Sequence, residues 1–252
     1  MDNLPLLIDL HKRAKRLGPG GSAETGTAIT LANLKPSATL QIADIGCGTG
    51  ASTLQLARSL NAEITAVDFL PDFIEALEDN AEAEGLSEKI KPLVCSMEEL
   101  PFAENQFDVI WSEGAVYNMG FENGVTEWQR FLKPGGVLVV SEITWLTDNR
   151  PQELQQYWDA QYPEIDTASA KFTILEKAGY SPIGYFVLPE ECWLENYYRP
   201  MQESFPDFLA RNANDKDAVA IVEAEKEEIA LYEKYKAHYG YGVYIARKAV
   251  CA

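Results

Sequence analysis

A glycine-rich stretch and an acidic residue beyond it have the types and spacing needed to bind a nucleotide-like ligand. Residues 40–50 read LQIADIGCGTG, an apolar run that ends in Asp44 and is followed by Gly46, Gly48 and Gly50. Glycines let backbone N–H groups approach a ligand closely, because no Cβ blocks the way and a tight turn can adopt positive φ. Asp68 ends the next apolar run, roughly 20 residues further on, where a carboxylate can bind both ribose hydroxyls.

The spacing of these glycines separates two classes of cofactor. Dinucleotide-binding loops read Gly-x-Gly-x-x-Gly, which would put the third glycine at Ala51. The sequence instead has Gly-x-Gly-x-Gly with Asp44 two residues ahead, which disfavours a nicotinamide cofactor. A glycine loop that serves turn geometry alone is the remaining alternative for the loop taken by itself.

Alternating strands and helices would position these residues. We expect strands at 40–45, 63–67, 90–95, 107–112, 136–142, 181–188 and 242–246, and helices at 50–60, 71–84 and 122–132. Strict alternation predicts a doubly wound α/β fold with a mostly parallel sheet and right-handed crossovers. Ligands of such sheets bind at the carboxyl ends of the strands, so the residues after the first four strands should share one edge.

From residue 40 to 142 the sequence resembles the class I S-adenosylmethionine-dependent methyltransferases. The resemblance rests on the acidic glycine motif at 44–50, on Cys95–Phe102 after the third strand, on Phe107–Trp111, and on the Lys-Pro-Gly-Gly turn at 133–136 before the fifth strand. It implies a seven-stranded sheet whose antiparallel last strand inserts between strands five and six. It also implies a loop under the methionine part of the cofactor, an acid at the ribose, and quinone-biosynthesis methyltransferases as relatives.

The resemblance further implies which residues hold the cofactor, S-adenosyl-L-methionine, and its product S-adenosyl-L-homocysteine. The expected cofactor-binding residues are Arg16, Asp44, Gly46, Cys47, Gly48, Gly50, Asp68, Phe69, Ser96, Met97, Ser112 and Glu113. Ser96 stands where many members have an aspartate that reads the adenine amino group. Arg16 belongs to a basic cluster on a helix expected at 4–17, ahead of a second helix at 22–34; that cluster is either a solvated helix face or a cover over the carboxylate of the cofactor.

The segment after the fourth strand, residues 111–120, is the expected acceptor side. Glu113 and Tyr117 are the candidate catalytic residues, although methyl transfer needs no dedicated base. Glu113 is equally consistent with a surface or helix-start carboxylate. The expected acceptor pocket contains Tyr117, Asn118, Trp145 and Tyr198. The segment lacks the Asn/Asp-Pro-Pro-aromatic motif of enzymes that methylate amide or base nitrogens.

We expect one methyltransferase domain over residues 1–252. N-terminal helices occupy 1–36, the α/β core occupies 37–188 and 241–250, and a helical cap is inserted at 189–240 between the last two strands. The insertion is too long for a simple connection. Its run Glu225–Glu228 is interpreted as solvated surface.

Composition narrows the possible partners and locations. A net charge of −18 argues against nucleic acid and anionic membranes, and no apolar run is long enough to span a bilayer. Without a secretory signal, and with four cysteines at no metal-ligand spacing, the sequence favours a cytoplasmic protein with no metal site. The predicted function is methyl transfer to a small-molecule acceptor. A nicotinamide-dependent oxidoreductase and a non-catalytic cofactor-binding protein are the alternatives, and a homodimer is left open.

Overall fold

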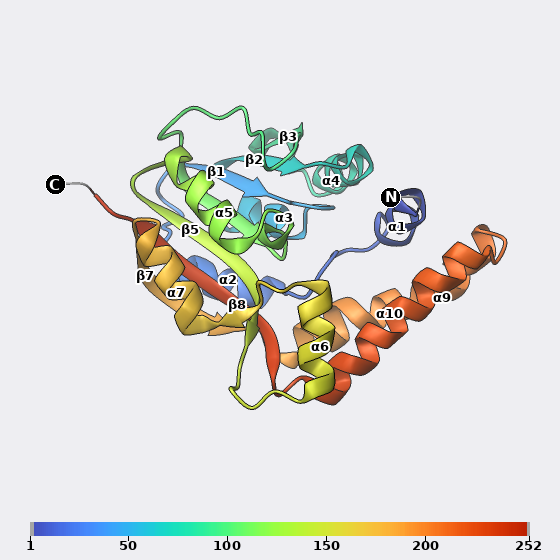
Figure 1. The fold of residues 1–252 in the computed structure, drawn as a ribbon. Helices are drawn as coiled ribbons and strands as arrows, with labels where there is room; N and C mark the ends of the chain where they lie inside the picture. The colour runs from blue at the N-terminus through green and yellow to red at the C-terminus, as the bar shows by residue number, and fades with distance from the viewer. Residues whose placement is uncertain (1–2, 251–252) are drawn as a thin grey trace.

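A twisted sheet forms the centre of the computed structural model, which describes residues 3–250 (Figure 1). Its strands are β1 Leu40–Ile45, β2 Ala62–Asp68, β3 Ile90–Val94, β4 Phe107–Glu113, β5 Leu132–Trp145, β6 Asp166–Thr167, β7 Tyr180–Val187 and β8 Tyr239–Lys248. The order is β3-β2-β1-β4-β5-β8-β7, and the two-residue β6 pairs with β5. Strand β8 is antiparallel to both β5 and β7, which confirms the expected insertion of an antiparallel last strand.

Helices connect the strands and cover both faces of the sheet (Figure 1). The α-helices are α1 Leu4–His11, α2 Ser22–Leu31, α3 Ala51–Ser59, α4 Pro71–Ala83, α5 Phe121–Trp128, α6 Gln152–Gln161, α7 Ala168–Lys177, α8 Glu190–Trp193, α9 Arg199–Arg211 and α10 Lys216–Tyr235. Short 3₁₀ turns occupy Ser87–Lys89, Val116–Asn118 and Gln129–Phe131, and a π-helical turn occupies Leu194–Tyr198. The crossovers between successive strands explain why the first five strands, β1, β2, β3, β4 and β5, pair in parallel with one another.

Successive residues along the central strands pack into two different hydrophobic cores. Ile42, Val109 and Trp111 lie in the core that α2, α3 and α4 cover. Their neighbours Ala43 and Ile110 lie in the core that α5 and α7 cover. Because side chains of a strand alternate between the faces of a sheet, burial on both faces requires the nearly continuous apolar strands that the sequence shows.

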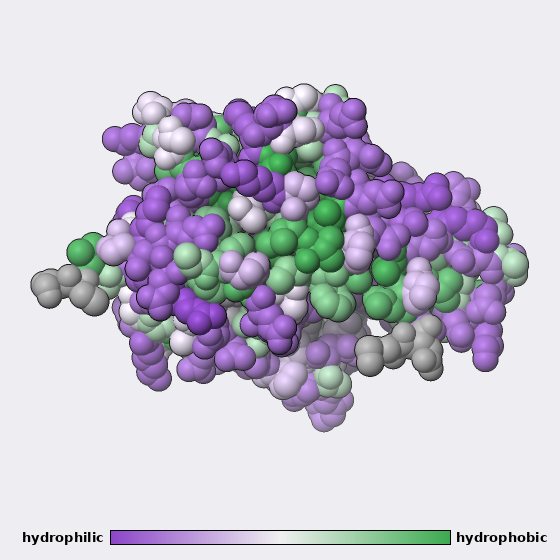
Figure 2. Space-filling view, turned by 90° about the horizontal axis from the view of Figure 1, so that it is seen from above, coloured by the Kyte–Doolittle hydropathy of each residue, from purple (hydrophilic) through white to green (hydrophobic). Residues whose placement is uncertain are grey.

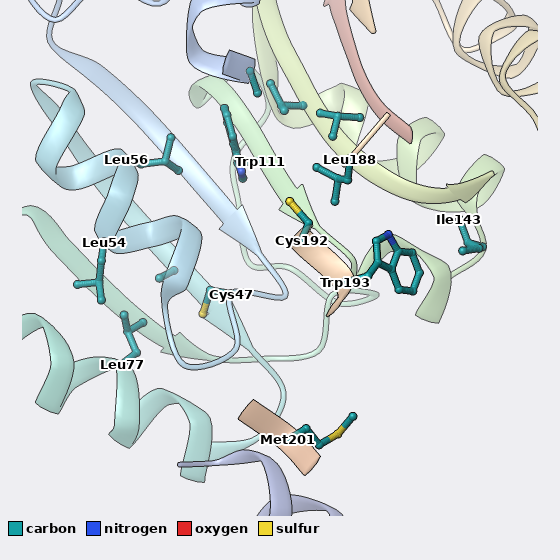
Figure 3. Packing of buried hydrophobic residues seen from close by; sticks show 14 of the residues in the cluster. Cys47, Leu54, Leu56, Leu77, Trp111, Ile143, Leu188, Cys192, Trp193 and Met201 are labelled. Carbon is teal, nitrogen blue, oxygen red and sulfur yellow. The ribbon is translucent and has the colours of Figure 1, made fainter. Parts of the chain in front are cut away.

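The inserted helices α8, α9 and α10 extend the first of these cores beyond the sheet. Trp193 and Tyr198 of the insertion are buried together with Phe205 and Tyr232, and Trp193 stacks on Tyr232 with ring centroids 4.3 Å apart. Figure 3 shows Trp193 near Ile143 at the end of β5 and Leu54 near Leu77 between α3 and α4. The insertion is therefore fixed to the ligand edge of the sheet, and we refer to residues 189–238 as the cap.

Two expectations about local structure are wrong. The first helix ends at His11 rather than at residue 17, and residues 12–21 form turns that run to the sheet edge. The Lys-Pro-Gly-Gly segment is a bulge inside β5 and does not precede it: Asp108 alone stands between the paired positions Phe107↔Leu132 and Val109↔Val137. Of the four cysteines counted in the sequence, Cys251 lies outside the described residues. None of the helices within residues 3–250 combines the length and apolar character that a membrane span requires.

Candidate cofactor and acceptor site

The glycine loop after β1 is held in a conformation that only glycine adopts readily. Gly46 has a φ of +76° and Gly48 a φ of +54°. A Cβ on Gly46 would stand 2.3 Å from the Cβ of Ala115, and one on Gly48 would stand 2.7 Å from Cδ1 of Leu17. The loop is tied to β2 because the amides of Gly46 and Cys47 both donate to the carbonyl of Val67. Close packing on both sides thus explains why these positions are occupied by glycine.

Asp44 lies beneath this loop and not in its ligand-facing surface. Its Oδ2 accepts hydrogen bonds from Ser52 Oγ at 2.8 Å and from Thr53 Oγ1 at 2.6 Å, while its fully buried Oδ1 has no partner in the described part of the protein. Burial raises the pKa of Asp44 to about 7. The Asp44 carboxyl therefore links the end of β1 to the first turn of α3, the two elements that flank the glycine loop.

Asp68 at the end of β2 links the glycine loop to the start of α4. Its Oδ2 accepts from the amide of Gly48 at 2.9 Å, and its Oδ1 accepts from the amide of Leu70 at 3.0 Å. Burial raises the pKa of this carboxyl above its usual value. The following residue, Phe69, is 66% exposed, which is unusual for phenylalanine and leaves its ring free to cover a planar group.

Arg16 and Glu113 meet in an ion pair, although the sequence allowed a solvated position for each. Their side chains are only 13% and 16% exposed. Glu113 Oε1 also accepts from Thr25 Oγ1 at 2.8 Å and from Trp111 Nε1 at 3.0 Å. The carboxylate therefore accepts a hydrogen bond at each oxygen, an arrangement that disfavours a role as proton acceptor.

One cavity of about 760 Å³ collects most of the predicted residues. Among its lining residues are Arg16, Gly46, Cys47, Gly48, Asp68, Phe69, Ser96, Met97, Glu113, Tyr117 and Asn118. The volume falls within the roughly 300–1,000 Å³ typical of small-molecule sites. The face seen in Figure 2 is mostly hydrophilic, with hydrophobic residues gathered across its middle.

Several predicted residues do not line this cavity, and each has a structural reason. Gly50 packs against Leu77, and the Ser112 hydroxyl donates to the carbonyl of Ile45 inside the sheet. Trp145 is buried against Tyr239 because β5 continues to residue 145. Tyr198 points into the cap, where its hydroxyl donates to Glu228 Oε1 at 2.9 Å.

Other cavity residues were not predicted from the sequence. Tyr197 takes the place expected for Tyr198, because residues 194–198 form a π-helical turn that changes which side chains face inward. Leu17 covers the glycine loop, and Thr49 Oγ1 donates to the carbonyl of Ala14. Glu225 also lines the cavity and Glu228 accepts from Tyr198, so the interpretation of Glu225–Glu228 as solvated surface is wrong for these two residues. The spacing of Glu225 from Ile221 and Ile229 on α10 is the signal that could have revealed its position.

Comparisons with known proteins agree with this geometry. Residues 42–136 match the family model "Methyltransferase domain". The ubiquinone/menaquinone biosynthesis C-methyltransferase of Dinoroseobacter shibae is 34% identical over 115 residues, which cover 45% of this chain and 46% of that protein. The chain thus spans less than half the length of that relative.

Two solved structures share the fold over nearly the whole chain. A methyltransferase from Geobacter sulfurreducens, in complex with S-adenosyl-L-homocysteine, aligns with a TM-score of 0.84 at 16% identity, over 96% of this chain and 97% of that one. The [4+2]-cyclase SpnF aligns with a TM-score of 0.74 at 22% identity, over 99% of this chain and 93% of that one.

Proposed function

Because its core makes this chain a member of the class I S-adenosylmethionine-dependent methyltransferases, we propose that it methylates a small molecule held between residues 113–118 and the cap. The observation that carries this proposal is the cavity of about 760 Å³, which the glycine loop lines together with Tyr117, Asn118 and Tyr197. A cofactor and an acceptor in this one cavity would be near neighbours, which an in-line transfer requires.

The residues of the cavity fit the cofactor. The glycine loop supplies backbone close to a ligand, and Asp68 supplies a carboxylate at the strand edge for the ribose hydroxyls. Phe69, Ser96 and Met97 lie at the same edge and are proposed to contact the adenine. Arg16 is proposed to lie over the carboxylate end, held there by Glu113. The bound cofactor supplies a methyl group activated by a sulfonium, so the protein has only to align the acceptor and exclude water.

The acceptor side is proposed to be Tyr117 and Asn118 opposite the cap. Tyr117 is 44% exposed as a residue, and its ring packs edge to face against Tyr162, with centroids 6.2 Å apart. Asn118 Nδ2 donates to the carbonyl of Ala115, which stabilises the 3₁₀ turn that carries both residues. Trp145 and Tyr198 are not proposed again as pocket residues, since both are buried in the core. A small-molecule acceptor agrees with the name of the relative from Dinoroseobacter, a ubiquinone/menaquinone biosynthesis C-methyltransferase.

The two alternative functions are not equally well supported. The nicotinamide-dependent alternative is not supported, because the core matches a methyltransferase model and the fold is that of a methyltransferase solved with S-adenosyl-L-homocysteine. A protein that binds this cofactor without transferring its methyl group remains a real rival, since the fold is shared with a cyclase. Turnover must therefore be measured in addition to binding.

The test is formation of S-adenosyl-L-homocysteine from S-adenosyl-L-methionine, followed by mass spectrometry, with pooled amines, phenols, thiols and quinols as acceptors. Asp68→Asn should reduce turnover at limiting cofactor at least about tenfold, since it removes a charged acceptor of hydrogen bonds. Glu63→Gln is the matched control, because Glu63 lies on the same strand but is half-exposed and paired with Lys91. Product above background with wild type and Glu63→Gln supports the proposal. Background levels with every pool, despite cofactor binding, would favour the non-catalytic rival.

A further inference from the structure

The acceptor end of the cavity is acidic on the side formed by the cap. Glu225 of α10 lines the cavity together with Tyr117 and Tyr197, and its side chain is only 16% exposed. Glu228 follows one turn later on the same face of α10, next to Tyr198. Their neighbours Lys226 and Glu227 are exposed on the opposite face. The helix therefore directs the carboxylates of Glu225 and Glu228 inward, whereas the charged residues between them point to solvent.

No fixed cation on the cavity wall balances Glu225. Arg16 is the only lysine or arginine among the lining residues of the described chain, and it is paired with Glu113. The lining carboxylates are Asp68, Glu98, Glu113 and Glu225. His11 of α1 has its Nε2 3.9 Å from Glu225 Oε1, but burial lowers the pKa of His11, so its ring is neutral near pH 7. The wall thus presents more negative than positive charge to a ligand.

Burying a carboxylate without a counter-charge is costly, and the raised pKa of Glu225 reflects that cost. Burial, and then the nearby Glu228, raise the pKa of Glu225 to about 7. Burial also raises the pKa of Glu228, although the Tyr198 hydroxyl opposes this by donating to it. A ligand cation beside Glu225 would supply the missing positive charge and restore its ionised form.

We propose that this subsite binds the methyl acceptor as a cation, an amine in its ammonium form, with Glu225 as counter-ion and the rings of Tyr117 and Tyr197 against the charge. Tyrosine rings attract cations through their negative faces, and the attraction strengthens where water is excluded. This inference deepens the proposed function and rests on it, because it names the chemical class of acceptor for the same cavity.

Transfer to such an acceptor balances with the groups present. The ammonium first loses one proton to the Glu225 carboxylate, which frees the nitrogen lone pair. The lone pair forms the new N–C bond while the S–C bond breaks and its electron pair stays on sulfur. The proton leaves Glu225 for solvent at the open side of the cavity, so no oxidant or further reactant is needed.

The test uses benzylamine and benzyl alcohol, which have similar shape and differ in charge at pH 7, titrated into the protein saturated with S-adenosyl-L-homocysteine. Benzylamine should bind at least about tenfold more tightly than the alcohol. Glu225→Gln should remove this preference, whereas Glu227→Gln, which removes an outward carboxylate two residues away, should keep it. Equal affinities, binding of neither probe, or a preference that survives Glu225→Gln would overturn the inference.

The same titrations separate this inference from the proposed function. Binding of S-adenosyl-L-homocysteine is measured first in all three proteins and should be unchanged, because Glu225 lies on α10 of the cap and not on the glycine loop or strand β2. If S-adenosyl-L-homocysteine does not bind, the proposed function fails and the amine inference fails with it. If it binds and turnover occurs only with phenols, thiols or quinols, the amine inference alone is overturned.

Discussion

The guanidinium of Arg16 and the carboxylate of Glu113 join two parts of the chain that are 97 residues apart. Arg16 lies in the turns after α1, and Glu113 is the last residue of β4. The pair holds residues 12–19 against the glycine loop, where Leu17 packs on Gly48 and Thr49 bonds to Ala14. A segment without regular structure is thereby made part of the cavity wall.

Removing either partner of this pair should therefore cost stability, and the two losses should not add. For Arg16→Gln, Glu113→Gln and the double variant, urea unfolding of the cofactor-free protein should give a coupling energy of about 0.5–3 kcal/mol. The exposed pair Lys91–Glu63 is the control cycle and should give a clearly smaller coupling energy, because solvent screens exposed charges. Additive losses at Arg16 and Glu113 would contradict the assigned role of the ion pair.

The buried carboxyl of Asp44 should make the protein less stable as pH rises. Its pKa is about 7 in the folded protein and 3.8 as the ordinary value, so between these limits the folded state holds a proton that the unfolded state has released. Stability then falls with rising pH through this window, by at most about 1.4 kcal/mol per pH unit for this one group. Glu142 and Glu225 have similarly raised pKa values and add to the slope.

Asp44→Asn tests this directly, because asparagine keeps an oxygen for the Ser52 and Thr53 hydroxyls. Urea unfolding at pH 5 and pH 8 should show a flatter pH dependence in the variant, with its stability relative to wild type greater at pH 8 than at pH 5. An unchanged slope between the two pH values would mean that Asp44 is already ionised in the folded protein.

The buried pair of Lys171 and Glu142 should be costly to break from the lysine side. Lys171 Nζ lies 3.7 Å from Glu142 Oε1 and donates to the carbonyl of Glu164 at 2.9 Å, and neither Glu142 oxygen has a hydrogen-bond partner among the described residues. Lys171→Met should destabilise the protein by about 3–5 kcal/mol at pH 8, since it leaves a buried charge alone. The loss should be smaller at pH 5, where Glu142 takes up a proton.

The double variant Lys171→Met/Glu142→Gln is the informative comparison. It removes both charges and should recover part of the loss measured for Lys171→Met alone. Thermal and urea unfolding of the single and double variants measure this recovery. A double variant less stable than Lys171→Met would show that Glu142 stabilises the fold independently of the lysine.

Gly50 should tolerate no side chain, for a reason that concerns packing and not the ligand. Its φ is +93°, and an added Cβ would stand 2.2 Å from Cδ1 of Leu77. Gly50→Ala should therefore lower stability by roughly 1–3 kcal/mol. Gly18→Ala is the control, since nothing lies within 4 Å of a Cβ there, and it should change stability by about 0.5 kcal/mol or less. Equal effects in urea unfolding would refute this reading of the loop.

The sheet and its ligand edge could be predicted because they depend on local patterns. The apolar run before Asp44 and the acid at Asp68 each mark a strand end, and parallel alternation brings such ends together. The order of the last two strands followed from family resemblance rather than from the pattern of residues. The bulge at 133–136 could not be predicted because a Lys-Pro-Gly-Gly sequence favours a turn, while the strand continues only because pairing with β4 resumes at Val137.

The acceptor side was harder to predict because it depends on contacts between distant segments. Tyr197 replaces Tyr198 only because the turn at 194–198 is π-helical, which aromatic spacing alone does not reveal. Glu225 belongs to a run of charges that is typical of surface, yet the cap packs that side of α10 over the cavity. For Arg16 the sequence supports both a solvated position and a place over the cofactor, because only the tertiary fold brings it to Glu113.

The most direct test of the central claim is calorimetric titration of the purified protein with S-adenosyl-L-homocysteine and with NAD. The account predicts one binding site for S-adenosyl-L-homocysteine and no binding of NAD. The variant Asp68→Asn should bind S-adenosyl-L-homocysteine at least about tenfold more weakly than wild type. Binding of NAD, or equal binding of S-adenosyl-L-homocysteine by wild type and Asp68→Asn, would contradict the site described at the ends of β1 and β2.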